Sequence, residues 1–396
     1  MTQSPATRVD IFCRVVDNYG DIGVAWRLAR QLVAEYGAEV RLFVDDVASF
    51  EKIAGYELNS KVVDGSVFPS ILHWKAPPNG EFINFCYAAD IVIEAFACEI
   101  PEAYLLQMQM QIETQTQTQT VAATECKPKL PLWINLEYLS AESWVADFHL
   151  QKSPHPRLRM TKYFYFPGFV TRSGGLIREK AIRPAVVEKT ADTEAGRLNV
   201  FAFGYDIPEI KSLINVIVAD EGVARITLPE GGLASTLANT FATDQKINVM
   251  PFVPQPDFDS LLMAHNFLMV RGEDSFVRAQ YAAKPFIWQI YPQDEAAHLL
   301  KLNAFLDLYC VGMTLPLADS LRLISNWLSG AALPATPLQY WQNLTAHLAE
   351  WRAHAVMWQH HLLKQQDLAF QLMTFYQKPH IIQPSVAPSQ ASFNRS

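Results

Sequence analysis

Residues 9–23, VDIFCRVVDNYGDIG, join a run of apolar residues to an amphipathic stretch that continues to residue 36. The pattern predicts a strand over Val9–Val16, a loop over Asp17–Gly23 and a helix over Val24–Tyr36. In an open α/β sheet, ligands bind at strand-to-helix turns, outside the carboxyl ends of the strands. The loop therefore marks both the start of a parallel sheet and a candidate site.

The residues of this loop argue against a dinucleotide site. A dinucleotide fingerprint brings three glycines against a pyrophosphate, whereas this loop has Gly20 and Gly23 together with Asp17 and Asp21. Two carboxylates repel a pyrophosphate and suit a cationic or hydroxylic group, so one can orient an acceptor while the other takes its proton. The alternative is that one aspartate is a helix N-cap and the other is simply solvated.

Strand-like and helix-like segments alternate through both halves of the chain, which predicts parallel βαβ units. The predicted strands are residues 9–16, 39–44, 89–95 and 132–136 in the first half, and 199–203, 224–228, 247–252, 267–270 and 285–291 in the second. A chain of 396 residues also exceeds the ~250 to 300 at which one core stops growing. We therefore expect two Rossmann-like domains.

The predicted organisation has a boundary in the looser region 172–197. It comprises a first domain over 1–180, a second over 198–360, a helix over 361–378 that can pack back on the first domain, and a flexible tail over 379–396. Residues 107–120, QMQMQIETQTQTQT, have no apolar face to bury. This Gln/Thr-rich tract is predicted to be a flexible surface insertion without a catalytic part.

Composition limits the partners and the compartment. The net charge of −8 and the pI near 5.7 argue against nucleic acid as a partner. The longest apolar runs are far shorter than the ~20 residues of a membrane span, so no membrane association is expected. Five cysteines without a C-x-x-C pair indicate reduced thiols, and no export signal is visible near the start. We expect a cytoplasmic protein.

A second loop with candidate chemistry is Arg271-Gly272-Glu273-Asp274-Ser275, again between an apolar strand and a helix. Ser275 or Asp274 can cap the helix, its free N–H groups can hold a phosphate oxygen, and Arg271 adds charge. Glu273 fits a diphosphate poorly unless it accepts from sugar hydroxyls, which points to a nucleotide. The alternative is an ordinary capped turn whose arginine pairs with its own acids.

Three further residues lie at predicted strand ends of the second half. Phe252 can stack on a base and Gln255 can read the edge of that base, while Tyr205 can donate to a phosphate. Phe252 can equally be a core residue, and Tyr205 can be a buried tyrosine satisfied elsewhere. No G-x-S-x-G, H-E-x-x-H or P-loop motif is present, so hydrolase, zinc protease and P-loop readings lack support.

With these residues assembled, the chain resembles the EarP family, the bacterial protein-arginine rhamnosyltransferases that modify elongation factor P. The matching stretches are IFCRVVDNYGDIGVAWRLARQL, IEAFACEIPE, INLEYLSAE, GGLIRE, PFVPQPDFD and RGEDSFVRAQYAAKPFIWQIYPQDE. The resemblance covers most of the chain to about residue 305, and the Gln/Thr-rich tract is the departure from it.

The resemblance implies a GT-B glycosyltransferase, with two Rossmann-like domains facing across a cleft and the donor bound by the second. The family transfers L-rhamnose from dTDP-β-L-rhamnose, with inversion, to an arginine of the KOW-like domain of elongation factor P, and needs no metal or other cofactor. By motif, Asp21 matches the proposed general base and Asp17 its essential neighbour, with Asn18 beside them on the acceptor side. Glu273 matches an essential acid. The implied donor contacts are Tyr205, Phe252, Gln255, Arg271, Asp274 and Ser275.

Elementary chemistry adds a constraint. A guanidinium has a pKa above ~12, so a carboxylate cannot remove its proton in advance, and deprotonation must accompany bond formation. We therefore expect Asp17 and Asp21 to clamp the incoming arginine and Asp21 to accept the proton late.

Three rival functions remain open at this point. They are another GT-B glycosyltransferase with a different nucleotide sugar, an NAD oxidoreductase that uses Asp45 or Asp46 as its ribose acid, and a non-catalytic adaptor that docks an elongation factor.

Overall fold

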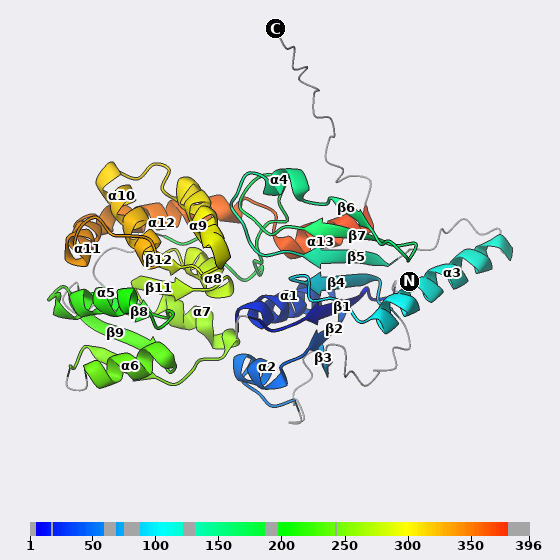
Figure 1. The fold of residues 1–396 in the computed structure, drawn as a ribbon, viewed down its shortest axis with the longest axis horizontal. Coiled ribbons are helices and arrows are strands. Elements are labelled where there is room, and N and C mark those ends of the chain that lie inside the picture. The colour runs from blue at the N-terminus through cyan, green and yellow to red at the C-terminus, as the bar shows by residue number, and fades with distance from the viewer. Residues whose placement is uncertain are drawn as a thin grey trace, which may run out of the picture.

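The structure, a computed structural model, describes residues 5–16, 19–58, 69–74, 88–121, 131–186, 197–241 and 244–378, except for the side chains of 115–121 and 294. Two β-sheets lie end to end along the long axis of the molecule, with helices packed against them (Figure 1). The predicted α/β class with two Rossmann-like domains is confirmed. The domain boundaries set from the sequence stay predictions, and the predicted tail lies outside the described residues.

The first sheet has the spatial order β3-β2-β1-β4-β5-β7-β6. Its strands are β1 (Arg8–Cys13), β2 (Glu39–Val44), β3 (Ser70–His73), β4 (Ile91–Ala95), β5 (Leu132–Leu136), β6 (Lys152–Pro154) and β7 (Thr161–Tyr165). They pair in parallel except for β6, which runs antiparallel to β7. The four strands predicted in this half are present. The other three are short or half-exposed, so no buried apolar run marks them in the sequence.

The second sheet is fully parallel, with the order β10-β9-β8-β11-β12. Its strands are β8 (Leu198–Ala202), β9 (Val223–Pro229), β10 (Ile247–Met250), β11 (Phe267–Arg271) and β12 (Phe286–Gln289), and all five were predicted. Strand order reverses at β8 here and at β1 in the first sheet, where β2 lies on one side and β4 on the other. These reversals open a crevice at the carboxyl ends of the strands. The two candidate loops lie there.

The helices connect the strands and then continue past the second sheet. They are α1 (Gly20–Tyr36), α2 (Val47–Ala54), α3 (Glu102–Val121), α4 (Val145–Phe148), α5 (Pro208–Ala219), α6 (Gly232–Thr240), α7 (Gln255–Met263), α8 (Asp274–Tyr281), the short 3₁₀ helix η2 (Asp294–Ala296), α9 (Ala297–Tyr309), α10 (Leu315–Trp327), α11 (Pro337–Ala346), α12 (Leu348–Leu363) and α13 (Leu368–Gln377).

Helix α1 is held close to its neighbours by a glycine. A Cβ at Gly23 would lie 3.2 Å from Ile53 Cδ1 on α2 and 3.4 Å from Gln255 Nε2 in the second domain. The contact with Ile53 is tighter than most Cβ contacts, so a side chain here requires Ile53 to shift slightly, and any side chain larger than alanine also meets Gln255 of the second domain. The second glycine of the first loop therefore serves domain packing.

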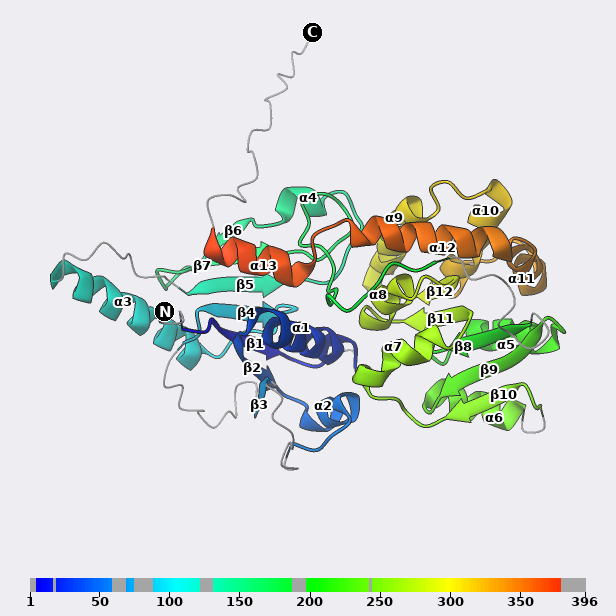
Figure 2. The same cartoon turned by 180° about the vertical axis from the view of Figure 1, so that it is seen from behind.

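The last two helices return to the first domain. Helix α12 packs beside the second sheet, where Gln359 donates to the carbonyl of Tyr281, and α13 lies beside the first sheet (Figure 2). The side chains of α13 join the core beneath α1, and Phe375 contacts the ring of Tyr163 at 5.2 Å. Residues 361–378 thus form the end of α12 and all of α13, and the side chains of α13 lie in the core of the first domain.

The Gln/Thr-rich tract differs from its prediction. Residues 107–120 belong to helix α3, which projects from the first domain in Figure 1. The first turns of α3 bury Tyr104 and Met108 in the core on the far face of the sheet. Once those turns are fixed, each further residue extends the helix at low cost because nucleation has already occurred. The expectation that the tract has no apolar face to bury was wrong at its start, because Met108 is buried and Ile112 packs against the same core. That the tract is a flexible surface insertion without a catalytic part stays a prediction.

A buried cluster of charges joins the two domains. On α1, Arg27 is only 2% exposed and makes two bonds to Asp274 of α8, with Nε–Oδ1 at 2.7 Å and Nη2–Oδ2 at 3.1 Å. Its Nη1 lies 3.0 Å from Glu179 and 3.5 Å from Asp259. Arg278 of α8 pairs with the same Glu179 and Asp259. We call Arg27, Arg278, Glu179, Asp259 and Asp274 the interdomain ion cluster.

The cluster keeps its charges despite burial. Burial alone would lower the pKa of Arg27, but Asp274, Asp259 and Glu179 hold it above the ordinary value. Burial likewise works to raise the pKa of Glu179, and Arg278 and Arg27 override it to lower that pKa to about 2. The charges therefore compensate one another, and removal of Arg27 leaves Asp274 without its ion-pair partner in the cluster.

Replacement of Arg27 by Met is expected to lower the free energy of unfolding by about 3 to 5 kcal/mol, because the partly buried Asp274 then keeps its charge without its bidentate partner. Equilibrium urea denaturation measures the change. Arg157→Met is the matched control, since Arg157 and Glu102 form a pair with both side chains at least 70% exposed, and it is expected to cost less than about 1 kcal/mol. Equal effects of the two substitutions would contradict the role of the cluster.

A buried histidine ties helix α4 to the first sheet. His149 follows α4, is 7% exposed, and accepts the backbone N–H of Phe166 at Nδ1 over 3.1 Å. Its ring packs edge-on against Tyr165 at 4.6 Å. Burial lowers the pKa of His149 to about 4, so the native protein holds this imidazole neutral well below the pH at which an exposed histidine is protonated.

This site is expected to make stability depend on pH. Above pH ~6.5, His149 is neutral in both the native and the unfolded state. Below that pH the unfolded chain binds a proton at His149, whereas the native state does not bind it until about pH 4. The free energy of unfolding therefore falls by up to ~1.4 kcal/mol per pH unit over this range. Burial also lowers the pKa of His265 and His354, so the measurement is a difference between wild type and His149→Gln. That difference is expected to be constant above pH 7 and to fall toward pH 4; a flat difference throughout would contradict it.

Candidate active site

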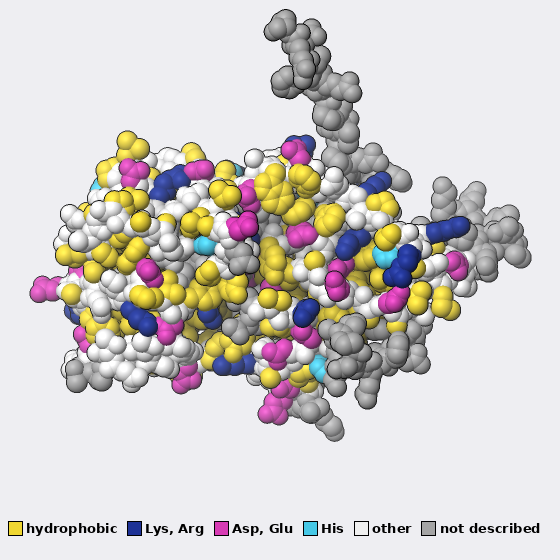
Figure 3. All heavy atoms as spheres, viewed as in Figure 1, with side chains coloured by type: hydrophobic (Ala, Val, Ile, Leu, Met, Phe, Trp, Pro, Cys, Tyr) yellow, Lys and Arg dark blue, Asp and Glu magenta, His cyan; other side chains and the backbone are white. Residues whose placement is uncertain are grey.

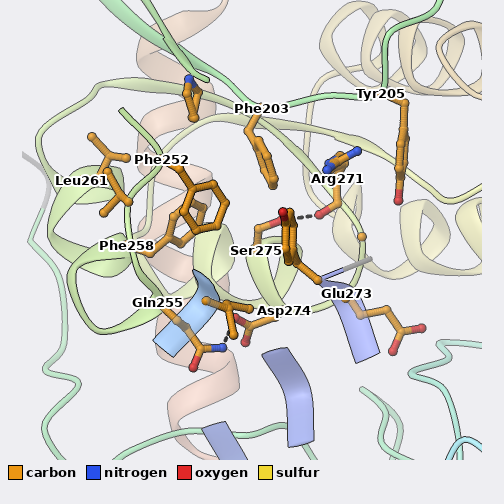
Figure 4. Close-up of a pocket in the computed structure, with 16 residues that line it drawn as sticks. Phe203, Tyr205, Phe252, Gln255, Phe258, Leu261, Arg271, Glu273, Asp274 and Ser275 are labelled. Carbon is orange, nitrogen blue, oxygen red and sulfur yellow. Dashed lines mark hydrogen bonds between the residues drawn. The ribbon is translucent and has the colours of Figure 1, made fainter. Parts of the chain in front are cut away.

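Six predicted donor residues line one cavity of the second domain. This aromatic cavity measures about 690 Å³ with its open mouth. Its lining includes Tyr205, Phe252, Gln255, Arg271, Asp274 and Ser275, together with Phe203 and Phe258 (Figure 4). The residues come from the carboxyl ends of β8, β10 and β11 and from the segments that follow them, including the first turns of α7 and α8, so the topology of the parallel sheet brings them together. Their roles toward a ligand stay predictions.

The first domain supplies one wall of the aromatic cavity. Tyr19, at the start of α1, lies 5.2 Å from the ring of Phe252, and Lys52 Nζ of α2 lies 5.0 Å from the same ring. Phe252 is half-buried and faces the opening between domains. In the space-filling view, hydrophobic side chains gather where the two halves meet (Figure 3). A flat aromatic group entering here would contact both domains.

Arg271 is held between two aromatic rings. Its guanidinium carbon lies 4.6 Å from the ring centroid of Phe203 and 4.6 Å from that of Tyr205 (Figure 4). Among the described residues no carboxylate forms an ion pair with Arg271. The acids of its own loop are engaged elsewhere, Glu273 with Lys301 and Asp274 with Arg27. The alternative in which Arg271 merely neutralises its own turn is therefore wrong.

Asp274 and Gln255 line the aromatic cavity and also contact residues of the first domain. The Gln255 amide nitrogen donates to the carbonyl of Gly23 at 2.7 Å and to Asp274 at 2.9 Å, while its oxygen accepts from Arg30 at 3.0 Å. Asp274 also binds Arg27. Both side chains thus have protein partners in this structure, so any contact with a donor would come in addition to domain packing. Ser275 donates through Oγ to the carbonyl of Arg271.

Asp21 lines a second cavity. This acidic cavity measures about 830 Å³ with its mouth and lies between the domains; its lining includes Asp21, Tyr138, Glu273, Tyr291 and Lys301. The N-cap of α1 is Tyr19, and Asp21 accepts the backbone N–H of Val16 at 2.9 Å. The alternative of an N-cap aspartate is therefore wrong for Asp21. Its predicted neighbours Asp17 and Asn18 lie outside the described residues.

Glu273 stands where the two cavities meet, since it lines both. One carboxylate oxygen accepts the backbone N–H of Leu139 at 3.0 Å, and the other accepts from Lys301 Nζ at 2.8 Å. Figure 4 shows the carboxylate directed away from Arg271. The structure thus brings the predicted acid of the second domain next to the cavity that holds the predicted acid of the first.

Tyr138 and Lys301 are among the lining residues of the acidic cavity that were not predicted. Tyr138 follows β5 within the stretch INLEYLSAE, and its position at the carboxyl end of a parallel strand was a usable signal. Lys301 lies in the middle of α9, where the sequence offers a helical lysine like any other. Only the folded chain places it against Glu273.

The acids that a dehydrogenase would need are occupied. Asp46 is the N-cap of α2 and accepts from the N–H of Ser49 at 3.0 Å, while Asp45 accepts the N–H of Val15 at 2.9 Å. Both have structural roles. The oxidoreductase alternative therefore loses the residues that favoured it.

The described part of the chain lacks a metal-binding cluster and a membrane-spanning helix. It holds no group of three or more His, Cys, Asp or Glu side chains placed to bind a metal ion. None of its helices has the length and apolar character required to cross a bilayer. That the protein requires no metal stays a prediction.

Comparison with known proteins identifies the family to which the chain belongs. The family model described as "Elongation-Factor P (EF-P) rhamnosyltransferase EarP" matches residues 9–377. The protein-arginine rhamnosyltransferase of Pseudomonas aeruginosa is 37% identical, with 93% of this chain and 98% of that protein covered. The enzyme of the same name from Shewanella oneidensis is 35% identical, with 95% and 99% covered.

Solved structures agree with this placement. A structure reported as the basis of EarP-mediated arginine glycosylation of elongation factor EF-P is 26% identical and has a TM-score of 0.57, covering 94% of this chain and 99% of that one. A spinosyn rhamnosyltransferase at 10% identity and a TM-score of 0.54, covering 93% and 100%, shows a shared fold alone. The chain therefore belongs to the EarP family of elongation factor P rhamnosyltransferases.

Proposed function

We propose that this protein transfers L-rhamnose from dTDP-β-L-rhamnose, with inversion, to a guanidinium nitrogen of an arginine in the KOW-like domain of elongation factor P. The observation that carries the proposal is the meeting of two cavities at Glu273. One has aromatic walls and an arginine without a carboxylate partner among the described residues, and the other holds Asp21. Membership of the EarP family supports the choice of sugar and acceptor.

The nucleotide occupies the aromatic cavity in this proposal. The thymine stacks on Phe252, with Phe258 and Tyr19 beside it, since offset aromatic stacking gains energy beyond the area it buries. The diphosphate lies toward Arg271, whose charge has no carboxylate counterion among the described residues. Tyr205 and the free N–H groups at the start of α8 add donors, and a helix N-terminus favours an anion.

The sugar extends past Glu273 into the acidic cavity, where the acceptor arginine enters from the other side. Asp21 is 3% exposed and presents a carboxylate to this space. A carboxylate binds a guanidinium through charge-assisted hydrogen bonds, which fix its plane as well as its position. Asp17 and Asn18 are the proposed further partners of the acceptor.

The chemistry needs one bond exchange and one proton transfer. The guanidinium nitrogen forms a bond to the anomeric carbon from the face opposite the nucleotide, and the bond from that carbon to the phosphate oxygen breaks with its electron pair on dTDP. As positive charge grows on the nitrogen, its proton passes to Asp21. Arg271 stabilises the charge that develops on the departing diphosphate. Loss of the proton before bond formation is excluded by the basicity of a guanidinium.

Removal of the Arg271 charge is expected to weaken dTDP binding. Arg271→Ala loses a charged hydrogen bond, so the Kd for dTDP is expected to rise roughly 10- to 100-fold, and less so at high salt. Isothermal titration calorimetry at two salt concentrations measures it. Arg225→Ala is the control, because Arg225 is exposed on β9 outside both cavities. An unchanged Kd for dTDP in Arg271→Ala would show that the diphosphate does not bind at Arg271.

Removal of the Asp21 charge is expected to abolish transfer and spare donor binding. Asp21→Asn keeps an acceptor for the N–H of Val16 but cannot take a proton, so turnover is expected to fall by about 10²- to 10⁴-fold. The assay is the intact mass of elongation factor P incubated with enzyme and dTDP-rhamnose. Calorimetry with dTDP is expected to give a Kd within about twofold of wild type.

The matched control for this substitution is Asp45→Asn. Asp45 also accepts a backbone N–H at 2.9 Å in the neighbouring loop but lines neither cavity. It is expected to retain turnover. Wild-type turnover by Asp21→Asn would overturn its role as the base, and an unmodified elongation factor with the wild-type enzyme would overturn the proposed function.

A further inference from the structure

A third cavity, which we call the polar cavity, adjoins the aromatic cavity. It measures about 850 Å³ with its open mouth. The residues that line both cavities include Tyr19, Phe203, Phe252 and Arg271. Lys52 of α2, in the first domain, lines the polar cavity as well. The proposed function uses Arg271 and leaves Lys52 without a role.

The ammonium group of Lys52 lies over two aromatic rings, one from each domain. Its Nζ is 5.5 Å from the ring centroid of Tyr19 and 5.0 Å from that of Phe252. Such a contact attracts a cation but does not neutralise it. The side chain is exposed, and among the described residues no carboxylate forms an ion pair with it. Lys52 therefore offers an uncompensated positive charge beside the aromatic cavity.

Helix α2 is packed against the second domain, which fixes the backbone of Lys52. The next residue, Ile53, lines the aromatic cavity and is 7% exposed. Gly55 ends the helix with a φ of 80°, and a Cβ there would lie 2.7 Å from Cγ of Pro254 in the second domain. Real Cβ atoms do not come so close to another carbon, so the glycine is what lets α2 approach the second domain.

The charges that line the polar cavity favour an anion. Lys52 and Arg271 have no carboxylate partner among the described residues. Two acids line the same cavity, and one of them, Asp206, is paired with Lys211 at 2.9 Å. The other, Glu230, is exposed. Two cations thus face one uncompensated carboxylate, so the net charge at this place is positive although the protein as a whole carries −8.

We propose that Lys52 is a donor-binding residue supplied by the first domain, which binds the diphosphate of the nucleotide sugar together with Arg271. The inference rests on the proposed function. A nucleotide whose thymine stacks on Phe252 and whose phosphates approach Arg271 runs along the residues that the two cavities share. The ammonium of Lys52 lies beside this path on a long and flexible side chain. The donor then contacts charged groups of both domains.

The substitution Lys52→Met keeps a long apolar side chain over the two rings and removes the charge. We expect the Kd for dTDP, measured by calorimetry, to rise about 5- to 20-fold, because one charged hydrogen bond is lost, and to rise less at high salt. KM for dTDP-rhamnose is expected to rise by a similar factor, with kcat within about threefold of wild type. Lys52→Arg restores the charge and is expected to bring the Kd back to within about threefold.

Two controls separate a contact with phosphate from a change in packing. Thymidine has the base and the sugar without the diphosphate, so its Kd, measured by ligand-observed NMR, is expected to be within about twofold in wild type and Lys52→Met. Lys180→Met is the matched substitution. Lys180 is also exposed, its Nζ lies 5.3 Å from the ring centroid of Tyr36, and it lines none of the three cavities. It is expected to keep the wild-type Kd for dTDP.

A Kd for dTDP within about twofold of wild type in Lys52→Met would overturn the inference. Equal weakening of thymidine and dTDP would overturn it as well, because the lysine would then act on the base or on packing. The wild-type enzyme is measured first, with dTDP and with elongation factor P. Its failure to bind dTDP or to modify the factor overturns the proposed function by a separate observation.

Discussion

Arg27 is the charge on which the arrangement of the two domains depends. It rises from α1 of the first domain and binds Asp274 at the start of α8 in the second, with Glu179 of the connecting segment beside it. Because α1 begins at the first candidate loop and α8 begins at the second, one guanidinium links the two helices that carry the site. The spacing of the two cavities follows from this contact.

The interdomain ion cluster also changes the net charge that the loop Arg271–Ser275 presents to a bound nucleotide. The loop Arg271–Ser275 contains one cation and two acids, and its net effect on an anion would be unfavourable if all three charges acted together. Arg27 compensates Asp274 and Lys301 compensates Glu273, while Arg271 is held between two rings. The loop can therefore offer positive charge on one side and a carboxylate on the other. This separation of charge depends on Arg27 and Lys301, which lie outside the loop, so the five residues of the loop do not produce it alone.

Much of the fold and part of the site could be predicted from the sequence. The sequence predicted nine of the strands that the structure describes, and most of these are buried apolar runs, although β10 is half-exposed. Strands β3, β6 and β7 were missed because they have half-exposed faces or lie at an edge and lack such a run. The two candidate loops were found because they follow buried strands. Roles that depend on distant partners could not be found in this way: Gln255 and Asp274 contact α1, more than 200 positions away. Lys301 had no local signature at all.

The polypeptide passes between the domains at two places, after residue 165 and again between α12 and α13, and these passages touch. The N–H of Leu368 donates to the carbonyl of Leu176 at 2.9 Å, and Arg178 donates to the carbonyl of Leu363 at 2.5 Å. The two connecting segments are therefore held to each other by hydrogen bonds as well as being tied to both domains by the chain. A movement of one domain against the other has to carry both segments together or break these bonds.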